Sequence, residues 1–130
     1  MNLPPGFNTV TPYFFVSDAP AFIAFLTEAF GGIELGRHVS DGRIANAQVR
    51  LGTSTVMISE ASEQFPAMPA SYYLYVSDAD HAMAQATSAG ATAILAVTDM
   101  PYGDRQGGVK DIHGNIWWLS QRLQPGPYYP

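Results

Sequence analysis

Histidine is the residue type to examine first for chemistry, because its imidazole binds metals and carries protons near neutral pH. The chain holds three histidines, His38, His81 and His113, and no cysteine. No two of them have ligand spacing on one face of one predicted element. Glu34 and His38 can share a face of one strand, but two positions on one strand do not complete a metal site. Surface or turn positions are therefore the simpler interpretation, and no catalytic set of acid, base and nucleophile is assigned.

Aromatic side chains are more informative, because they alternate along predicted strands. Tyr13 and Phe15 share one face of the first strand, and Tyr73 and Tyr75 share one face of a later strand. Pockets for small molecules are largely apolar and aromatic, with a few placed polar groups. We therefore treat these four side chains as candidate ligand contacts, with filling of a small core as the alternative.

Two adjacent tryptophans lie on the last predicted strand. Trp117 and Trp118 must point to opposite faces of the sheet. Trp117 is expected to pack under a helix as part of the core. Trp118 then either fills the interior or forms a stacking wall for a planar ligand.

The pair Asp104 and Arg105 has two interpretations. The two side chains can form an ion pair that fixes the entry to a strand, or Arg105 can donate to an acceptor on a ligand. Gly103, Gly107 and Gly108 mark an irregular strand entry, which favours a structural role.

A sixty-residue repeat organises these candidates. Tyr13–Leu35 aligns with Tyr73–Leu95 without a gap, and Val-Ser-Asp-Ala occurs at residues 16–19 and again at 76–79. Two copies are too few for a solenoid, which needs about three units. The repeat therefore predicts one domain built from two similar halves.

The first half has the pattern of a strand, a helix and three strands. Asp18 can cap a helix whose apolar residues recur from Ala19 to Phe30, and Gly31-Gly32 ends it. Asp41-Gly42 is a strong hairpin signal. The predicted strands are Val10–Val16, Ile33–Ser40, Arg43–Leu51 and Thr55–Ser59.

The second half repeats this pattern, with a helix that starts after Asp78 and ends at Gly90. Its inner stripe is poorer in large residues. The predicted strands are Ser71–Val76, Thr92–Thr98, Gln106–Asp111 and Ile116–Gln121. The expected fold is α+β, with two tandem βαβββ modules (residues 8–60 and 71–122), a linker (61–70) and an extended tail (123–130), all in one domain 1–130.

Composition limits the function classes. Of 130 residues, 47% are apolar and 13% are charged, which is typical of a globular domain. The net charge of −5 argues against nucleic-acid binding and favours a neutral or cationic ligand. No leader-like start and no long apolar run are present, so we expect a cytoplasmic protein with no membrane contact.

The segment Tyr102–Trp118 carries a family resemblance. It reads Tyr-Gly-Asp-Arg, then Gly-Val-Lys-Asp-Ile-His-Gly, then Asn-Ile-Trp. This pattern resembles the PhnB-like branch of the vicinal oxygen chelate superfamily, which includes glyoxalase I, bleomycin-resistance proteins and extradiol dioxygenases. The resemblance covers Thr9–Arg122 and implies sheets that curl into a cup with the helices outside.

The resemblance also implies where metal ligands would lie. The metal enzymes of the superfamily use four inward positions, usually His, Glu, His and Glu, and these fall here at Thr11, Met57, Ser71 and Trp118. None of these is an imidazole or a carboxylate, which divalent ions need. We therefore expect no metal and no other cofactor.

The resulting prediction is a metal-free small-molecule-binding protein that sequesters a planar aromatic compound, such as a cationic antibiotic, and forms a homodimer. The alternatives are a lyase, isomerase or dioxygenase-type enzyme with a non-standard site, and a structural domain whose aromatic residues fill the cup. The predicted ligand-binding residues are Tyr13, Phe15, Met57, Ser71, Tyr73, Tyr75, Arg105 and Trp118.

Overall fold

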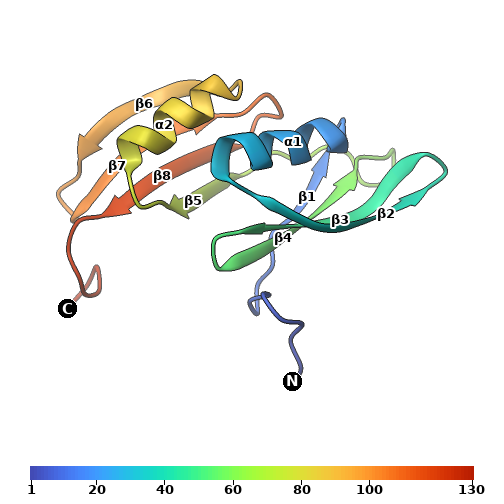
Figure 1. The fold of residues 1–130 in the computed structure, drawn as a ribbon, viewed down its shortest axis with the longest axis horizontal. Coiled ribbons are helices and arrows are strands. Elements are labelled where there is room, and N and C mark those ends of the chain that lie inside the picture. Colours follow the sequence, from blue (N-terminus) through green and yellow to red (C-terminus); the bar gives the residue numbers. More distant parts are fainter. The chain divides into compact units, whose positions relative to one another are not determined.

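A computed structural model describes residues 1–130 in full, and they form two compact units, Met1–Pro69 and Ala70–Pro130. Each unit holds one helix and one four-stranded sheet in the order βαβββ (Figure 1). The predicted α+β class with two tandem βαβββ modules is confirmed, and the boundary between the units falls inside the predicted linker. That the two units make one domain stays a prediction.

The first unit has the strand order β1-β4-β3-β2. Strands β1 and β4 are parallel, and the other neighbours are antiparallel. Its elements are β1 (Tyr13–Val16), α1 (Ala19–Phe30), β2 (Ile33–Ser40), β3 (Arg43–Leu51) and β4 (Ser54–Glu60).

The second unit repeats this topology with the order β5-β8-β7-β6. Strands β5 and β8 are its parallel pair. Its elements are β5 (Ser71–Tyr75), α2 (Ala79–Ser88), β6 (Thr92–Asp99), β7 (Asp104–Lys110) and β8 (Ile116–Arg122).

Both helices are capped at their N-termini by the predicted aspartates. The side chain of Asp18 accepts from the Ala21 amide at 3.2 Å, and that of Asp78 accepts from the His81 amide at 3.0 Å. Gly31 ends α1 at a φ of 69°, a left-handed conformation that glycine adopts without steric cost. Neither helix is long and apolar enough to cross a membrane.

The hairpin between β2 and β3 forms where the sequence predicts it. Asp41 and Gly42 have φ values of 54° and 73°, as a two-residue turn with the twist of the strands requires. Strand β1 is shorter than expected, since it begins at Tyr13 and leaves Val10 and Thr11 outside. Thr11 instead donates its hydroxyl to the Asn8 carbonyl at 3.2 Å.

The core of each unit lies between the helix and one face of its sheet. Helix α1 buries Phe22, Phe25 and Leu26 there, whereas the buried residues of α2 are all alanines. Trp117 is 2% exposed and donates its indole N–H to Asp111 at 2.8 Å, so its predicted core role is confirmed. We call the face that carries the helix the helix side, and the opposite face the open face.

The turn between β7 and β8 is closed by one carboxylate. Asp111 Oδ1 accepts from the amides of His113 and Asn115 at 2.8 and 3.0 Å. The Asp111 amide in turn donates to the Asn115 carbonyl at 2.9 Å. This turn fixes the register in which β8 presents Trp117 and Trp118 to opposite faces.

Candidate functional site

The edge strands β1 and β5 place the predicted aromatic pairs on the open faces of their sheets. Tyr13 and Phe15 have ring centroids 5.0 Å apart, and Tyr73 and Tyr75 have theirs 5.3 Å apart. The pairs occupy equivalent positions, because Tyr13 pairs with Met57 on β4 and Tyr73 pairs with Trp118 on β8. Each open face therefore has a short aromatic ladder at one edge.

The ladder of the first unit is anchored by neutral groups. The hydroxyls of Tyr13 and Ser59 lie 2.6 Å apart, and Ser59 donates to the Ala45 carbonyl at 2.6 Å. Since Ser59 has a single proton, Tyr13 donates to Ser59 and accepts from the Asn46 amide nitrogen at 3.3 Å. No charge takes part in this set of hydrogen bonds.

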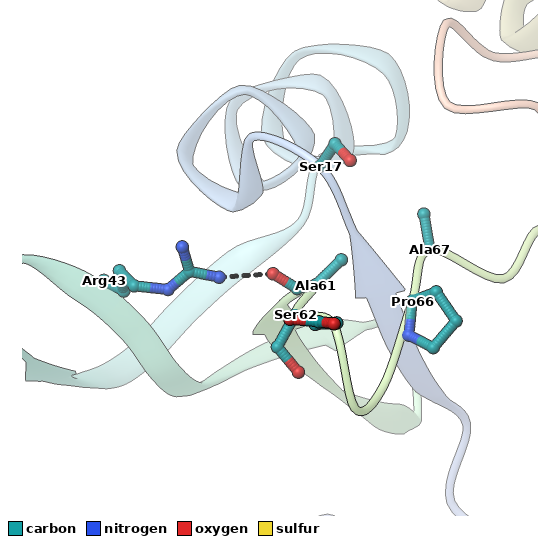
Figure 2. Close-up of a pocket in the computed structure, with 7 residues that line it drawn as sticks. Ser17, Arg43, Ala61, Ser62, Pro66 and Ala67 are labelled. Carbon is teal, nitrogen blue, oxygen red and sulfur yellow. Dashed lines mark hydrogen bonds between the residues drawn. The ribbon is translucent and has the colours of Figure 1, made fainter.

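Two pockets lie beside this ladder. One has a volume of about 440 Å³, and Tyr13, Phe15, Arg43 and Phe65 are among the residues that line it. Phe65 of the linker stacks on Phe15, with centroids 5.7 Å apart and planes 17° apart. The second pocket, of about 500 Å³, is shown in Figure 2 and is lined by Ser17, Arg43, Ala61, Ser62, Glu63, Pro66 and Ala67.

Arg43 is the charged group shared by these pockets. Its guanidinium points into the pocket of Figure 2 and donates to the Ala61 carbonyl. Glu60, which also lines the first pocket, is already occupied, since its carboxylate accepts from the Asp18 and Ala19 amides at 2.8 and 2.9 Å. Glu60 therefore helps to hold the start of α1.

The open face of the second unit is built around a buried carboxylate. Asp104, the first residue of β7, is 0% exposed. Its Oδ2 accepts from the hydroxyls of Tyr73 at 2.7 Å and Ser120 at 2.9 Å. Its Oδ1 accepts from the Arg122 guanidinium at 2.9 Å. The ladder tyrosine of this unit is thus anchored to a charge.

The tail adds a further donor to the same carboxylate. The Tyr128 hydroxyl lies 2.6 Å from Asp104 Oδ2 and 2.7 Å from the Tyr75 hydroxyl. The Arg122 guanidinium lies over the Tyr128 ring, 4.2 Å from its centroid. Residues 123–130 form no helix or strand, and Tyr128 brings this tail back to the sheet.

These contacts keep Asp104 ionised. Burial opposes the charge, but the hydrogen bonds from the three hydroxyls and Arg122 outweigh it, so that the pKa of Asp104 is lowered to about 2. Burial first, and then the contact with Asp104, raise the pKa of Tyr73 to about 12, although the Ser120 hydrogen bond opposes this rise. The hydrogen bond to Asp104 is also the largest cause of the raised pKa of Tyr128.

Trp118 lies across the same open face. Its ring covers Gly108, where a Cβ would come within 3.0 Å of the ring atoms. Its indole N–H donates to the Ser71 hydroxyl at 2.8 Å. The missing Cβ at Gly108 thus leaves room for the Trp118 ring next to β7.

The four positions that the family uses for metal ligands do not fit a metal here. Thr11 lies outside β1, and Met57 offers only a thioether. Ser71 and Trp118 bond to each other. Thioether, hydroxyl and indole groups do not replace imidazole and carboxylate around a divalent ion.

The structure brings together most of the predicted ligand residues, within each unit. Ser71, Tyr73, Tyr75 and Trp118 follow the alternation of the second open face, and Tyr13, Phe15 and Met57 follow that of the first. Arg105 is apart from them, because it pairs with Asp80 at the start of α2 on the helix side.

The suggested ion pair between Asp104 and Arg105 is wrong. Adjacent residues on a strand point to opposite faces, so Arg105 pairs with Asp80 and Asp99 while Asp104 pairs with Arg122. Sequence reasoning missed Arg122 and Tyr128 as partners of Asp104. Strand alternation from Gly108 back to Asp104 could have placed Asp104 on the open face, but no local signal indicates the return of Tyr128.

Comparison with known proteins agrees with this fold. The model of the Glyoxalase/Bleomycin resistance protein/Dioxygenase superfamily matches residues 6–119. An uncharacterized protein of Mycobacterium bovis is 34% identical over 127 residues, covering 88% of this chain and 84% of the relative. An uncharacterized protein of Mycobacterium tuberculosis is also 34% identical, covering 88% and 75%.

Solved structures share the fold. TioX from Micromonospora sp. ML1 has a TM-score of 0.77 at 25% identity, covering 89% of this chain and 99% of its own. TnmS3, an antibiotic binding protein from Streptomyces sp. CB03234, has a TM-score of 0.70 at 21% identity, covering 88% and 98%.

Proposed function

Since this chain belongs to the Glyoxalase/Bleomycin resistance protein/Dioxygenase superfamily, we propose that it binds a planar aromatic compound, such as an antibiotic, and sequesters it without a metal. The observation that carries the proposal is the aromatic open face of the second unit. Tyr73 and Tyr75 are 43% and 58% exposed there, on the face that Trp118 lines. Large exposed aromatic side chains gathered on one face are typical of binding surfaces.

Sequestration needs affinity and no chemistry. An offset-stacked aromatic contact adds about 1 kcal/mol beyond the area that it buries. Two such contacts and the burial of a planar ring can reach roughly micromolar affinity after the entropic cost of association. The net charge of −5 favours a cationic compound, whose binding should weaken as salt rises. TnmS3, with the same fold, is a precedent for holding an antibiotic on such a scaffold.

The direct test is calorimetric titration with planar antibiotics, flavins and quinolines. Trp118→Ala should weaken the binding of a compound that stacks on the second open face by about fivefold, as the loss of one stacking contact implies. Met57→Ala is the matched control, because Met57 holds the equivalent position in the first unit. Unchanged isotherms for Trp118→Ala, with the fold intact, would refute the stacking role.

Two further measurements bear on the proposal. Elemental analysis after purification without added metal should find no stoichiometric zinc, iron, nickel or manganese. Trp117→Ala tests the orientation of the tryptophan pair, since removal of this buried ring should lower the free energy of unfolding by about 3–5 kcal/mol. A metal that supports turnover and is removed by chelator would instead favour an enzyme.

We also propose a cytoplasmic homodimer. The edge strand β2 is exposed along its whole length, and Ile33, Leu35 and Val39 on it are 61%, 47% and 52% exposed. An exposed apolar edge strand invites pairing with another chain. Sedimentation should report a dimer at micromolar concentration, and a monomer there would contradict the proposal.

A further inference from the structure

The tail presents a phenol to the second open face in the manner of a bound ligand. Tyr128 follows the end of β8 by six residues and reaches Asp104 Oδ2 at 2.6 Å. Both parts of its side chain have partners: the hydroxyl meets Asp104 and Tyr75, and the ring lies 4.2 Å from the Arg122 guanidinium. The surface is therefore complementary to a hydroxylated aromatic ring.

Hydrogen bonds and the cation–π contact hold Tyr128 in place more than burial does. Tyr128 remains 42% exposed, and its neighbour Tyr129 is 84% exposed. If Tyr128 leaves, Asp104 keeps its bonds to Tyr73, Ser120 and Arg122. The carboxylate then stays ordered and has one acceptor position open toward the face.

The first unit has a corresponding contact between a later aromatic side chain and its open face, but this contact is apolar. Phe65 of the linker follows β4 by five residues and stacks on Phe15, which is the repeat equivalent of Tyr75. No carboxylate contacts Phe65, and its ring carries no hydroxyl that could donate a hydrogen bond. The two units therefore differ in the carboxylate, which is the group that would select a phenol.

We propose that Asp104, Tyr75 and Arg122 form a subsite for a phenolic hydroxyl and its ring, which Tyr128 occupies until a phenolic ligand displaces it. The inference rests on the proposed function and deepens it, because it names the chemical class of the ligand and adds an internal competitor. A phenol donates to the carboxylate through its hydroxyl while the guanidinium lies on the ring face, as cations do on aromatic rings.

The probe for this subsite is p-cresol, which is the tyrosine side chain cut off at Cβ. Tyr128→Ala should bind p-cresol at least tenfold more tightly than the wild type, because the competitor is gone. In this variant toluene should bind about tenfold more weakly than p-cresol, since a hydrogen bond to a charged group is lost. Tyr129→Ala is the control and should behave as the wild type.

Equal p-cresol affinity in Tyr128→Ala and the wild type would overturn the proposal, and so would equal binding of toluene and p-cresol. The chemical-shift changes that p-cresol causes must map to Tyr75, Asp104 and Arg122. Changes at other residues alone would also overturn the proposal. Should Tyr128→Ala fail to fold, the wild type provides the test: saturating p-cresol must shift the ring resonances of Tyr128 toward those of a free tyrosine, and unchanged ring resonances contradict displacement.

These outcomes are separable from the proposed function. Binding of p-cresol to Tyr128→Ala without any binding of planar antibiotics, flavins or quinolines would support the subsite and contradict the wider function. Binding of those planar compounds with equal affinity to the wild type and Tyr128→Ala, and no binding of p-cresol, would do the reverse. Phe65→Ala keeps the second unit intact, so its preference for p-cresol over toluene should be no greater than that of the wild type, because the first unit lacks the carboxylate.

Discussion

The two units use one topology and one aromatic ladder, but they anchor it differently. In the first unit the Tyr13 hydroxyl meets Ser59 and Asn46, which are neutral. In the second, the equivalent Tyr73 hydroxyl donates to Asp104, a carboxylate that is fully buried. The same fold element therefore carries a charged anchor in one unit and a neutral one in the other.

The two helices also differ, and here the first unit buries the larger apolar side chains. The buried face of α1 includes Phe22, Phe25 and Leu26, whereas α2 buries only Ala79, Ala82 and Ala86. Apolar area removed from water contributes roughly 25 cal/mol per Å². Helix α1 thus contributes more apolar burial to its unit than α2 does, and the second unit relies more on its sheet, through Trp117 in the core and the polar contacts of its open face.

The largest effect should come from the core of the first unit. Phe22 is 0% exposed and packs against Phe14, with centroids 4.9 Å apart. Phe22→Ala should lower the free energy of unfolding by about 3–5 kcal/mol through lost burial and a cavity. Met83→Ala in α2 is the matched change on a partly buried residue and should cost less, about 1 kcal/mol. Urea denaturation measures both, and equal losses would contradict the difference between the helices.

The second expected effect is acid sensitivity of the second unit. The pKa of Asp104 is about 2 in the folded protein, against an ordinary value of 3.8. A lowered folded pKa gives stability that is present above the ordinary value and is lost as pH falls toward the folded value. The wild type should therefore lose about 2 kcal/mol of unfolding free energy between pH 4 and pH 2 through this group.

Asp104→Asn is the control for that loss, because an amide does not titrate. Denaturant titrations at several pH values should show a smaller fall across the same window for Asp104→Asn than for the wild type. Parallel curves for the two proteins would mean that Asp104 has an ordinary pKa in the folded state. The first open face, anchored by neutral groups, should add nothing to this window.

Local signals explain which parts of the fold could be predicted. Asp18, Gly31 and the Asp41-Gly42 turn act on neighbouring residues, so α1 and the β2–β3 hairpin have the predicted bounds. The ladder residues followed from strand alternation. The start of β1 was misplaced because β-branched residues before Pro12 have strand character, yet only the chain from Tyr13 onward pairs as a strand.

The candidate site was predicted only in part, because its anchor joins distant residues. Asp104 contacts Arg122 and Tyr128, which lie 18 and 24 residues away in the sequence. Periodicity carries no information about such pairings, and a proline-rich tail gives no sign of where it folds. The predicted Asp104–Arg105 pair is wrong for the converse reason. Residues that are adjacent on a strand point to opposite faces of the sheet, so their side chains lie apart.

A third prediction compares the two anchoring serines. Ser120→Ala removes a hydrogen bond to the charged Asp104 and should cost about 2 kcal/mol. Ser59→Ala removes only neutral hydrogen bonds, to Tyr13 and the Ala45 carbonyl, and should cost about 1 kcal/mol. Thermal or urea unfolding of both variants measures the two losses of unfolding free energy. A larger loss for Ser59→Ala than for Ser120→Ala would contradict the assignment of the charged anchor to the second unit.

The smallest effect is expected at Arg105, a predicted ligand contact on the helix side. Its bonds to Asp80 and Asp99 are each 2.9 Å long, but those carboxylates are 62% and 65% exposed. Exposed ion pairs add little stability and are screened by salt. Arg105→Ala should therefore unfold close to the wild-type midpoint, whereas Arg122→Ala, whose partner Asp104 is buried, should unfold well before it. Ligand titration of the same two variants tests the faces: lost binding in Arg105→Ala alone would place the ligand on the helix side, and lost binding in Arg122→Ala alone would place it on the open face.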